Sequence, residues 1–165
     1  MYRLLQAEES DIPFMSELIL DGARNGHFRF DPTDVEVAQQ AHEEVCCMVR
    51  EGRRLARSER ARGVVVEADG RRVACAVLTD MEGGVDGYEL YVFAVDPQFR
   101  DQGVGRWLLD ALLERCRPVD LYVRCTRASE SMFAMLQRRG FEHLDTVDGE
   151  IRVLRRRRAG ASPPR

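Results

Sequence analysis

Two glycines follow an apolar, strand-like segment at a spacing that can expose main-chain N–H groups to a ligand. The segment is Tyr88–Val95, and Gly103 and Gly105 stand where an amphipathic stretch begins. A strand that turns into a helix leaves the first helical N–H groups without partners, and glycine lets a ligand approach the main chain closely. These N–H groups and the helix dipole favour an anion. The spacing therefore predicts a phosphate or pyrophosphate site over about residues 102–106.

A dinucleotide-binding turn also places glycines after a strand, but its pattern is incomplete here. Such a turn needs G-x-G-x-x-G, and the third glycine position holds Leu108. No acidic residue ends a following parallel strand in the manner that ribose binding requires. A dinucleotide fold is therefore not indicated, and the remaining alternative is that Gly103 only starts a helix.

The basic residues and the cysteines exclude several other chemistries. All 25 basic residues are arginine, whereas a phosphate-binding P-loop, a Schiff-base enzyme and a pyridoxal phosphate anchor each need a lysine. The 5 cysteines include no C-x-x-C pair, and the 3 histidines are scattered. We expect reduced thiols in the core and no metal site.

Hydrophobic periodicity predicts the elements that position the glycine turn. Strands are expected at residues 2–6, 64–67, 73–79, 88–95, 120–125, 141–145 and 151–155. Helices are expected after a cap at Ser10 or Asp11, from a capping box at Thr33-x-x-Glu36 as far as Gly52, and at 104–116 and 129–139. This order mixes an antiparallel meander with a strand-helix-strand crossover. It predicts an α/β (α+β) layered domain with a mixed sheet.

Length and composition fit one globular domain. The chain has 165 residues, of which 44% are apolar, and a net charge of -3. Folding at this length buries about 70% of the surface of the unfolded chain, so a core can form without disulfides or metals. We expect a single domain over 1–155 and a basic, disordered tail over 156–165. No apolar signal core or long apolar run is present, so we expect a cytoplasmic protein without a membrane segment.

These features together resemble the GNAT superfamily of acetyl-CoA-dependent N-acyltransferases. The pattern that carries the resemblance is R-x-x-G-x-G at Arg100–Gly105, directly after a strand that ends in V-D-P, with Gly140-Phe141 closing a later helix. The resemblance rests on motifs over residues 60–155 and on the order of the helices over residues 1–52. It implies a GNAT-like, mostly antiparallel central sheet with helices on both faces, acetyl-CoA as cofactor, and an enzyme that acetylates an amine.

The resemblance assigns coenzyme A mainly to main-chain groups. In the family the pyrophosphate lies on amides of the glycine turn, here Arg100, Asp101, Gln102, Gly103, Val104, Gly105 and Arg106. The pantetheine arm pairs like an extra strand with the preceding strand, here Phe93, Ala94 and Val95. A main-chain N–H near the end of that strand then stabilises charge on the acetyl oxygen. Ser129, where the family often has asparagine, and Phe133 complete the cofactor set, although a serine there also suits a helix cap.

The reaction that the family implies needs a base. An alkyl amine with a pKa of about 10.4 must lose a proton to attack a thioester. Glu89 resembles the family's strand glutamate, which draws this proton through water. Regular alternation would place it on the same face as Tyr91, Phe93 and Val95, whereas a bulge would change that facing. An ordinary ion-paired residue is the alternative for Glu89, and the other candidate bases are Glu82, Asp86 and Tyr88.

The family's general acid is missing from its usual place. The tyrosine expected four residues before the glycine of the G-F pair is Leu136 here, and its neighbours supply no phenol. A thiol with a pKa of about 8.5 is already a fair leaving group, so activity can survive. The substitution favours one alternative function, a module that binds coenzyme A or acyl-CoA without turnover. Cys125 is expected in the core, because the pattern places no histidine beside it.

The acceptor side is expected in the first third of the chain. In the family the front helices and their loop wall the acceptor site, and here that loop contains His27, Phe28 and Phe30. Residues 1–52 carry 11 acidic and 4 basic side chains, which would attract a cationic small-molecule or peptide amine. A solvated helix face and hydrophobic closure by the phenylalanines are the alternatives. Arg155–Arg158 is too short a run to predict a nucleic-acid partner, and a homodimer stays open.

Overall fold

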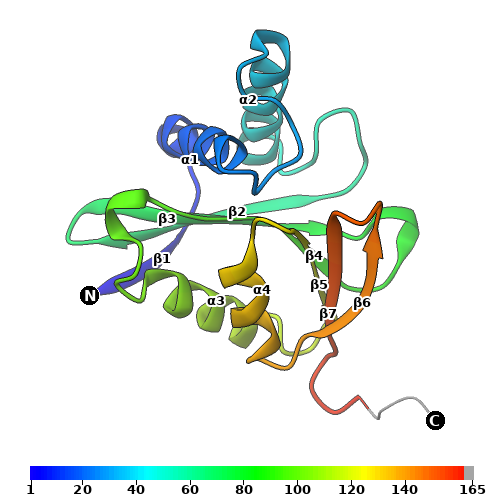
Figure 1. Ribbon diagram of the computed structural model, residues 1–165. Helices are drawn as coiled ribbons and strands as arrows, with labels where there is room; N and C mark the ends of the chain where they lie inside the picture. Colours follow the sequence, from blue (N-terminus) through cyan, green and yellow to red (C-terminus); the bar gives the residue numbers. More distant parts are fainter. Residues whose placement is uncertain (162–165) are drawn as a thin grey trace.

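Helices cover both faces of one seven-stranded sheet in the computed structural model, which describes residues 1–161 (Figure 1). The strands are β1 (Tyr2–Gln6), β2 (Ala61–Ala68), β3 (Arg71–Asp80), β4 (Tyr88–Val95), β5 (Leu121–Thr126), β6 (Glu142–Val147) and β7 (Ile151–Arg156). The α-helices are α1 (Ile12–Arg24), α2 (Val35–Arg50), α3 (Val104–Arg115) and α4 (Glu130–Gln137). Short 3-10 turns lie at Glu9–Asp11, Glu82–Gly84 and Pro97–Phe99.

The strand order is β1-β2-β3-β4-β5-β7-β6, and within the described residues each neighbouring pair is antiparallel except β4 and β5. Helices α1 and α2 lie on one face, and α3 and α4 lie on the other (Figure 1). This confirms the predicted mixed, mostly antiparallel sheet with helices on both faces. None of the helices within residues 1–161 combines the length and apolarity needed to cross a bilayer.

The central strands are buried on both faces, which explains their continuous apolar sequence. In β2, Val64 and Val66 belong to the core under α3 and α4, and Val65 belongs to the core under α1 and α2. Fully buried leucines of α3 and α4 fill the first core, and Met15 of α1 and Met48 of α2 fill the second. The sheet is therefore a fixed platform between two hydrophobic layers.

A bulge in β4 changes which side chains share a face. Val77 of β3 pairs with Val92, but Leu78 pairs with Leu90, so Tyr91 is the extra residue. Consequently Tyr91 and Val92 both pack toward α1 and α2, and Phe93 packs toward α3. The regular alternation considered for this strand is wrong, because the extra residue reverses the facing of every position after it.

The start of α2 also differs from the sequence prediction. Asp34 is the cap, and its Oδ1 accepts hydrogen bonds from the N–H groups of Glu36 (3.0 Å) and Val37 (3.2 Å). The hydroxyl of Thr33 donates instead to Asp31 at 2.6 Å. The predicted capping box at Thr33 is therefore wrong by one residue, because a local turn at Asp31 takes the threonine side chain.

The folded part of the chain continues a few residues beyond the predicted end of the domain. Strand β7 continues to Arg156. The N–H of Arg158 donates to Asp120 Oδ1 at 2.8 Å, and the N–H of Ala159 donates to the carbonyl of Arg117 at 2.9 Å. The disorder expected from residue 156 therefore does not begin there, and the part of that tail at 162–165 lies outside the described residues.

Replacing Gly87 with alanine is expected to lower the free energy of unfolding by about 3 kcal/mol, because the new Cβ has no room. Gly87 precedes β4 with φ +118°, and a Cβ there would lie 2.6 Å from the carbonyl oxygen of Asp120, just before β5. Gly84→Ala is the matched control, since Gly84 has φ +71° and no atom within 4 Å of such a Cβ. Urea unfolding should show a loss of about 1 kcal/mol for the control. Equal losses would contradict the importance of this close approach.

Candidate active site

The turn between β4 and α3 presents a helix start that no side chain caps. Gly103 is the N-cap of α3 in the left-handed conformation, at φ +87°, and the cap makes no side-chain hydrogen bond. A Cβ on Gly105 would lie 3.5 Å from Val95 and 3.8 Å from Phe93, so the first turn of α3 lies against β4. Backbone N–H groups at such an uncapped start, together with the helix dipole, can hold an anion.

Strands β4 and β5 separate just before this turn. Within the described residues their parallel register runs from Tyr88 opposite Leu121 to Leu90 opposite Val123 and then stops. On its other side β4 stays paired with β3 as far as Val95. The main chain of residues 91–95 therefore has an open edge toward β5, where an extended, amide-bearing group can pair like an added strand.

Arg100 closes part of this opening. Its Nε donates to the carbonyl oxygen of Val95 at 3.1 Å, and its Nη2 donates to Asp21 Oδ2 of α1 at 2.7 Å. The side chain thus ties the end of β4 to α1. The side chain of Arg100 therefore has a structural role, whereas its predicted role in cofactor binding belongs to its main-chain amide.

Glu89 lies buried beside the opening and forms an ion pair with a residue that sequence reasoning did not identify. Both carboxylate oxygens accept from Arg124 of β5, at 2.8 Å each from Nε and Nη2. The Glu89 side chain is 5% exposed and that of Arg124 is 46% exposed. The predicted base is therefore a buried carboxylate held in one orientation by a guanidinium that reaches solvent.

A second charged group lies next to Glu89 on the same face. Arg54 donates to Tyr91 Oη and to Glu44 Oε1, both at 2.8 Å, and its guanidinium stacks 4.0 Å from the centroid of the Tyr91 ring. Burial raises the pKa of the Tyr91 phenol, while the charge of Arg54 partly opposes that rise. Tyr91 therefore stays protonated and fixed by Arg54.

The alternative bases lie in other surroundings. Glu82 forms ion pairs with Arg57 and Arg54. Asp86 is largely exposed and forms an ion pair with Arg158. Tyr88 packs against the core under α3 and α4. Of the four candidate bases, Glu89 is the one that combines burial with a position on β4 beside the opening.

Comparison with known proteins agrees with this geometry. The family model described as "Acetyltransferase (GNAT) family" matches residues 25–141, which is well over half of the chain. The chain belongs to the GNAT acetyltransferase family. Mycothiol acetyltransferase of Propionibacterium freudenreichii subsp. shermanii is 40% identical over 77 residues, which are 44% of this chain and 24% of that protein. The chain thus matches about a quarter of that relative's length.

Solved structures show the same GNAT fold at low identity. Spermidine N-acetyltransferase of Vibrio cholerae, in complex with CoA and spermine, is 13% identical with a TM-score of 0.73 over 96% of each chain. The PaiA N-acetyltransferase of Thermoplasma acidophilum, in complex with coenzyme A, is 11% identical with a TM-score of 0.69, over 95% of this chain and 99% of its own. At these identities the likeness concerns the fold.

Acetyl-CoA is the cofactor of this GNAT fold, and the residues present fit it. The uncapped start of α3 at Gly103 suits a pyrophosphate, and the open edge of β4 suits the amides of the pantetheine arm. Both features are main-chain groups, so they need no lysine. The individual contacts of residues 93–95 and 100–106 with the cofactor stay predictions.

The loop after α1 meets the start of α4 at the far side of the opening. His27 Nδ1 lies 2.9 Å from Ser129 Oγ, and Thr126 Oγ1 donates to the carbonyl of Gly26 at 2.7 Å. The structure therefore brings one predicted acceptor residue, His27, against one predicted cofactor residue, Ser129. Ser129 occupies the N-cap of α4 but makes no side-chain cap hydrogen bond, so the capping alternative does not describe it.

The pKa of the His27 ring is expected to lie below the ordinary value for histidine. Partial burial and the positive charge of Arg100 lower the pKa of its ring from 6.5, against an opposing effect of Asp21. Stability from this group therefore rises with pH, because the unfolded chain binds the proton more tightly. An NMR titration of the ring should show that Arg100→Gln raises the pKa, since it removes a repelling charge and leaves Asp21 unpaired. Arg24→Gln is the control, and an equal shift there would contradict the assignment to Arg100.

Four other residues from the sequence analysis have clear positions. Phe28 and Phe30 pack against the core under α1 and α2, so hydrophobic closure accounts for both. Phe133 contacts the Arg152 guanidinium, which lies 3.9 Å from its ring centroid, and makes an edge contact with the His143 ring. Leu136 is fully buried, so the usual position of the general acid points into the core.

Cys125 also lies in the core, as expected from the sequence. Its exposed fraction is 3%, and burial raises the pKa of its thiol to about 11. At neutral pH such a thiol stays protonated and is a poor nucleophile.

The acidic residues of the front segment are mostly neutralised. Six of its carboxylates form ion pairs with arginines, namely Glu9, Asp11, Glu17, Asp21, Glu44 and Glu51. Four of the partners lie outside residues 1–52. The excess of acidic residues in that segment therefore does not by itself create a surface that attracts cations.

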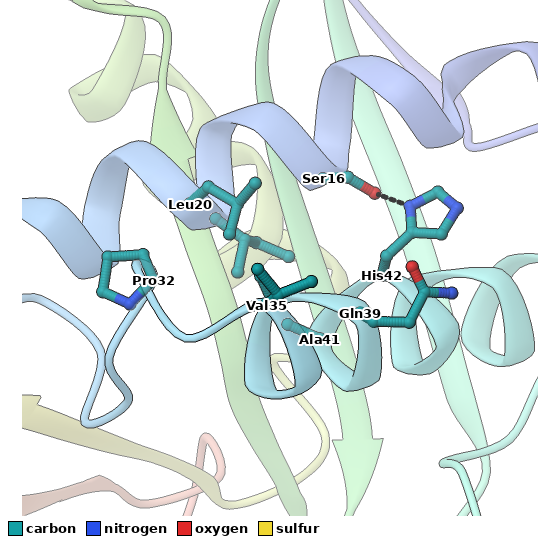
Figure 2. A pocket seen from close by; sticks show the side chains of 9 residues that line it. Ser16, Leu20, Pro32, Val35, Gln39, Ala41 and His42 are labelled. Carbon is teal, nitrogen blue, oxygen red and sulfur yellow. Dashed lines mark hydrogen bonds between the residues drawn. The ribbon is translucent and has the colours of Figure 1, made fainter.

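A cavity of about 340 Å³ lies between α1 and α2, on the sheet face opposite α3. Figure 2 shows Ser16 of α1 and His42 of α2 pointing toward one another beside it, with Ser16 Oγ 2.9 Å from His42 Nδ1. The rest of its lining is mainly apolar, including Leu20, Pro32 and Val35. None of the predicted site residues lines this cavity.

Proposed function

We propose that this chain transfers an acetyl group from acetyl-CoA directly to a primary amine of a small molecule or peptide. The observation that carries the proposal is the position of Glu89, a buried carboxylate on β4 beside the open edge of that strand. A base at this position would lie close to the thioester, if the pantetheine arm pairs with the open edge of β4. The likeness to mycothiol acetyltransferase over 77 residues supports acetyl transfer, while the acceptor of that protein is not carried over.

In the proposed reaction the chain supplies a proton acceptor and an anion site. Acetyl-CoA, when bound, supplies the acetyl group on a thioester. Glu89 takes a proton from the attacking amine through water as the nitrogen–carbon bond forms and the carbon–sulfur bond breaks. The sulfur leaves as a thiolate and takes a proton from water, because Leu136 leaves no phenol at the usual donor position. The raised pKa of Cys125 disfavours an acyl-enzyme at that thiol.

A second candidate function rests on the same residue, Leu136. A chain that lacks the usual acid at this position can hold coenzyme A or an acyl-CoA as a sensor without turnover. The two functions make different predictions for one assay, because both require cofactor binding and only the enzyme releases free thiol.

The test is to incubate the protein with acetyl-CoA and a panel of primary amines and to follow thiol release. Release that depends on the amine, with stoichiometric acetylated product, supports the enzyme. Calorimetric binding of coenzyme A with no release across the panel supports the sensor. Absence of coenzyme A binding would contradict both functions.

A further inference from the structure

Arg124 offers a free edge of its guanidinium beside the proposed base. Its Nε and Nη2 each donate a hydrogen bond to Glu89, and among residues 1–161 Nη1 makes none. A guanidinium has five N–H donors in a planar fork, so two donors hold Glu89 and three remain. The Arg124 side chain is 46% exposed, so a ligand can reach it from solvent.

The fold directs this edge toward the face where the acceptor is expected. Leu121, Val123 and Cys125 of β5 pack into the core under α3 and α4, so Arg124 projects from the opposite face. Glu89 and Tyr91 of β4 lie on that same face. Arg124 therefore borders the space between β5 and the helices α1 and α2.

The other charges near this edge are already compensated. Glu44 pairs with Arg54, and Glu82 pairs with Arg57. The neighbourhood thus has no surplus of negative charge to hold a polycation. The ion pair of Glu89 with Arg124 lies at this surface, and its guanidinium reaches solvent while its carboxylate is buried.

We propose that Arg124 binds a carboxylate of the acceptor, so that the preferred acceptor is an amine that also carries a carboxylate, such as an amino acid. This inference rests on the proposed function and adds the class of acceptor. A carboxylate matches the planar edge formed by Nη1 and Nη2, to which it can bind through two parallel hydrogen bonds. The zwitterion then lies antiparallel to the ion pair, with its carboxylate at Arg124 and its amine toward Glu89.

The test compares free L-amino acids with their C-terminal amides as acceptors for the wild type and for Arg124→Gln. In the wild type, kcat/KM for the acid should exceed that for the amide by about 100-fold, which corresponds to two charge-assisted hydrogen bonds. In Arg124→Gln this ratio should fall by about 100-fold, mainly through KM of the acid. The ratio isolates carboxylate binding, because any disturbance of Glu89 affects both acceptors equally.

Three further arms make the result decisive. Arg117→Gln removes the same charge from an exposed site that pairs with Glu114, and it should keep the wild-type ratio. Arg124→Lys keeps a charge beside Glu89 if the glutamine variant unfolds, and it should retain only part of the preference, since lysine lacks the fork. An aminoalkylphosphonate of matched length distinguishes a tetrahedral anion, and its preference over the carboxylate would overturn the assignment.

Failure of this inference differs from failure of the proposed function. Amides acetylated as well as acids by the wild type, or an unchanged ratio in Arg124→Gln, would overturn the role of Arg124 while leaving an acetyltransferase. If no amine releases thiol, the proposed function fails, and calorimetric titration of L-amino acids into the coenzyme A-loaded protein decides the inference. Binding that is lost in Arg124→Gln supports it, and equal or absent binding in both proteins overturns it.

Discussion

Glu89→Gln is expected to lower kcat for amine acetylation by about 10² to 10⁴-fold, the usual contribution of a general base. The amide side chain keeps nearly the same shape but cannot take the proton of the attacking amine. It still accepts a hydrogen bond from Arg124, which is half exposed and can be solvated at its other donors. We therefore expect coenzyme A affinity, measured by calorimetry, to stay within a few-fold of the wild type.

Glu82→Gln is the matched control for this substitution. Glu82 is also an ion-paired glutamate near Arg54, but it lies in the turn before β4 and not on the strand. Steady-state rates with several amines should show the loss of kcat in Glu89→Gln alone. A Glu89→Gln rate within tenfold of the wild type, or a larger loss in Glu82→Gln, would move the base to another residue.

Gly105→Asp is expected to weaken coenzyme A binding by about 100-fold or more, because like charges placed together cost several kcal/mol. The substitution puts a carboxylate in the first turn of α3, where the pyrophosphate is expected. Because a side chain at this position starts from a Cβ that lies against Val95 and Phe93, circular dichroism of the variant is needed to show that α3 is still folded. Calorimetric titration of coenzyme A measures the effect directly.

Gly105→Ala separates the charge from the added bulk. A Cβ at this position would make ordinary contact with Val95 at 3.5 Å, so alanine should fold normally and lose much less affinity than aspartate. Equal affinities for Gly105→Asp and the wild type would show that the anion does not bind at this turn. In that case the pyrophosphate assignment for residues 100–106 would have to be abandoned.

The elements around the glycine turn were predictable because their signals are local. The apolar run of β4 covers Tyr88–Val95 in both the prediction and the structure, since it ends two residues before Pro97, which cannot continue a strand. Helix α3 starts at Val104 as expected, because Gly103 takes the left-handed conformation of its cap. The hairpin at Asp69-Gly70 likewise follows from its turn residues.

The partner of Glu89 was not predictable, because it depends on the pairing of strands far apart in the sequence. The alternation of Leu121, Val123 and Cys125 does place Arg124 on the opposite face of β5. Nothing local says that β5 lies parallel to β4 in the register that brings Arg124 to Glu89. A bulge in this strand was one of the two facings considered, but its position at Tyr91 was not predictable, since no glycine or proline marks it.

The short parallel register between Tyr88–Leu90 and Leu121–Val123 divides the molecule into two leaves. One leaf is β1 to β4 with α1 and α2, and the other is β5, β7 and β6 with α4. Beyond that register the two leaves are joined by side chains, which include the ion pair of Glu89 with Arg124 and the contact of His27 with Ser129. A molecule that paired with the open edge of residues 91–95 would add main-chain hydrogen bonds to this part of the boundary, and we expect it to slow hydrogen exchange there.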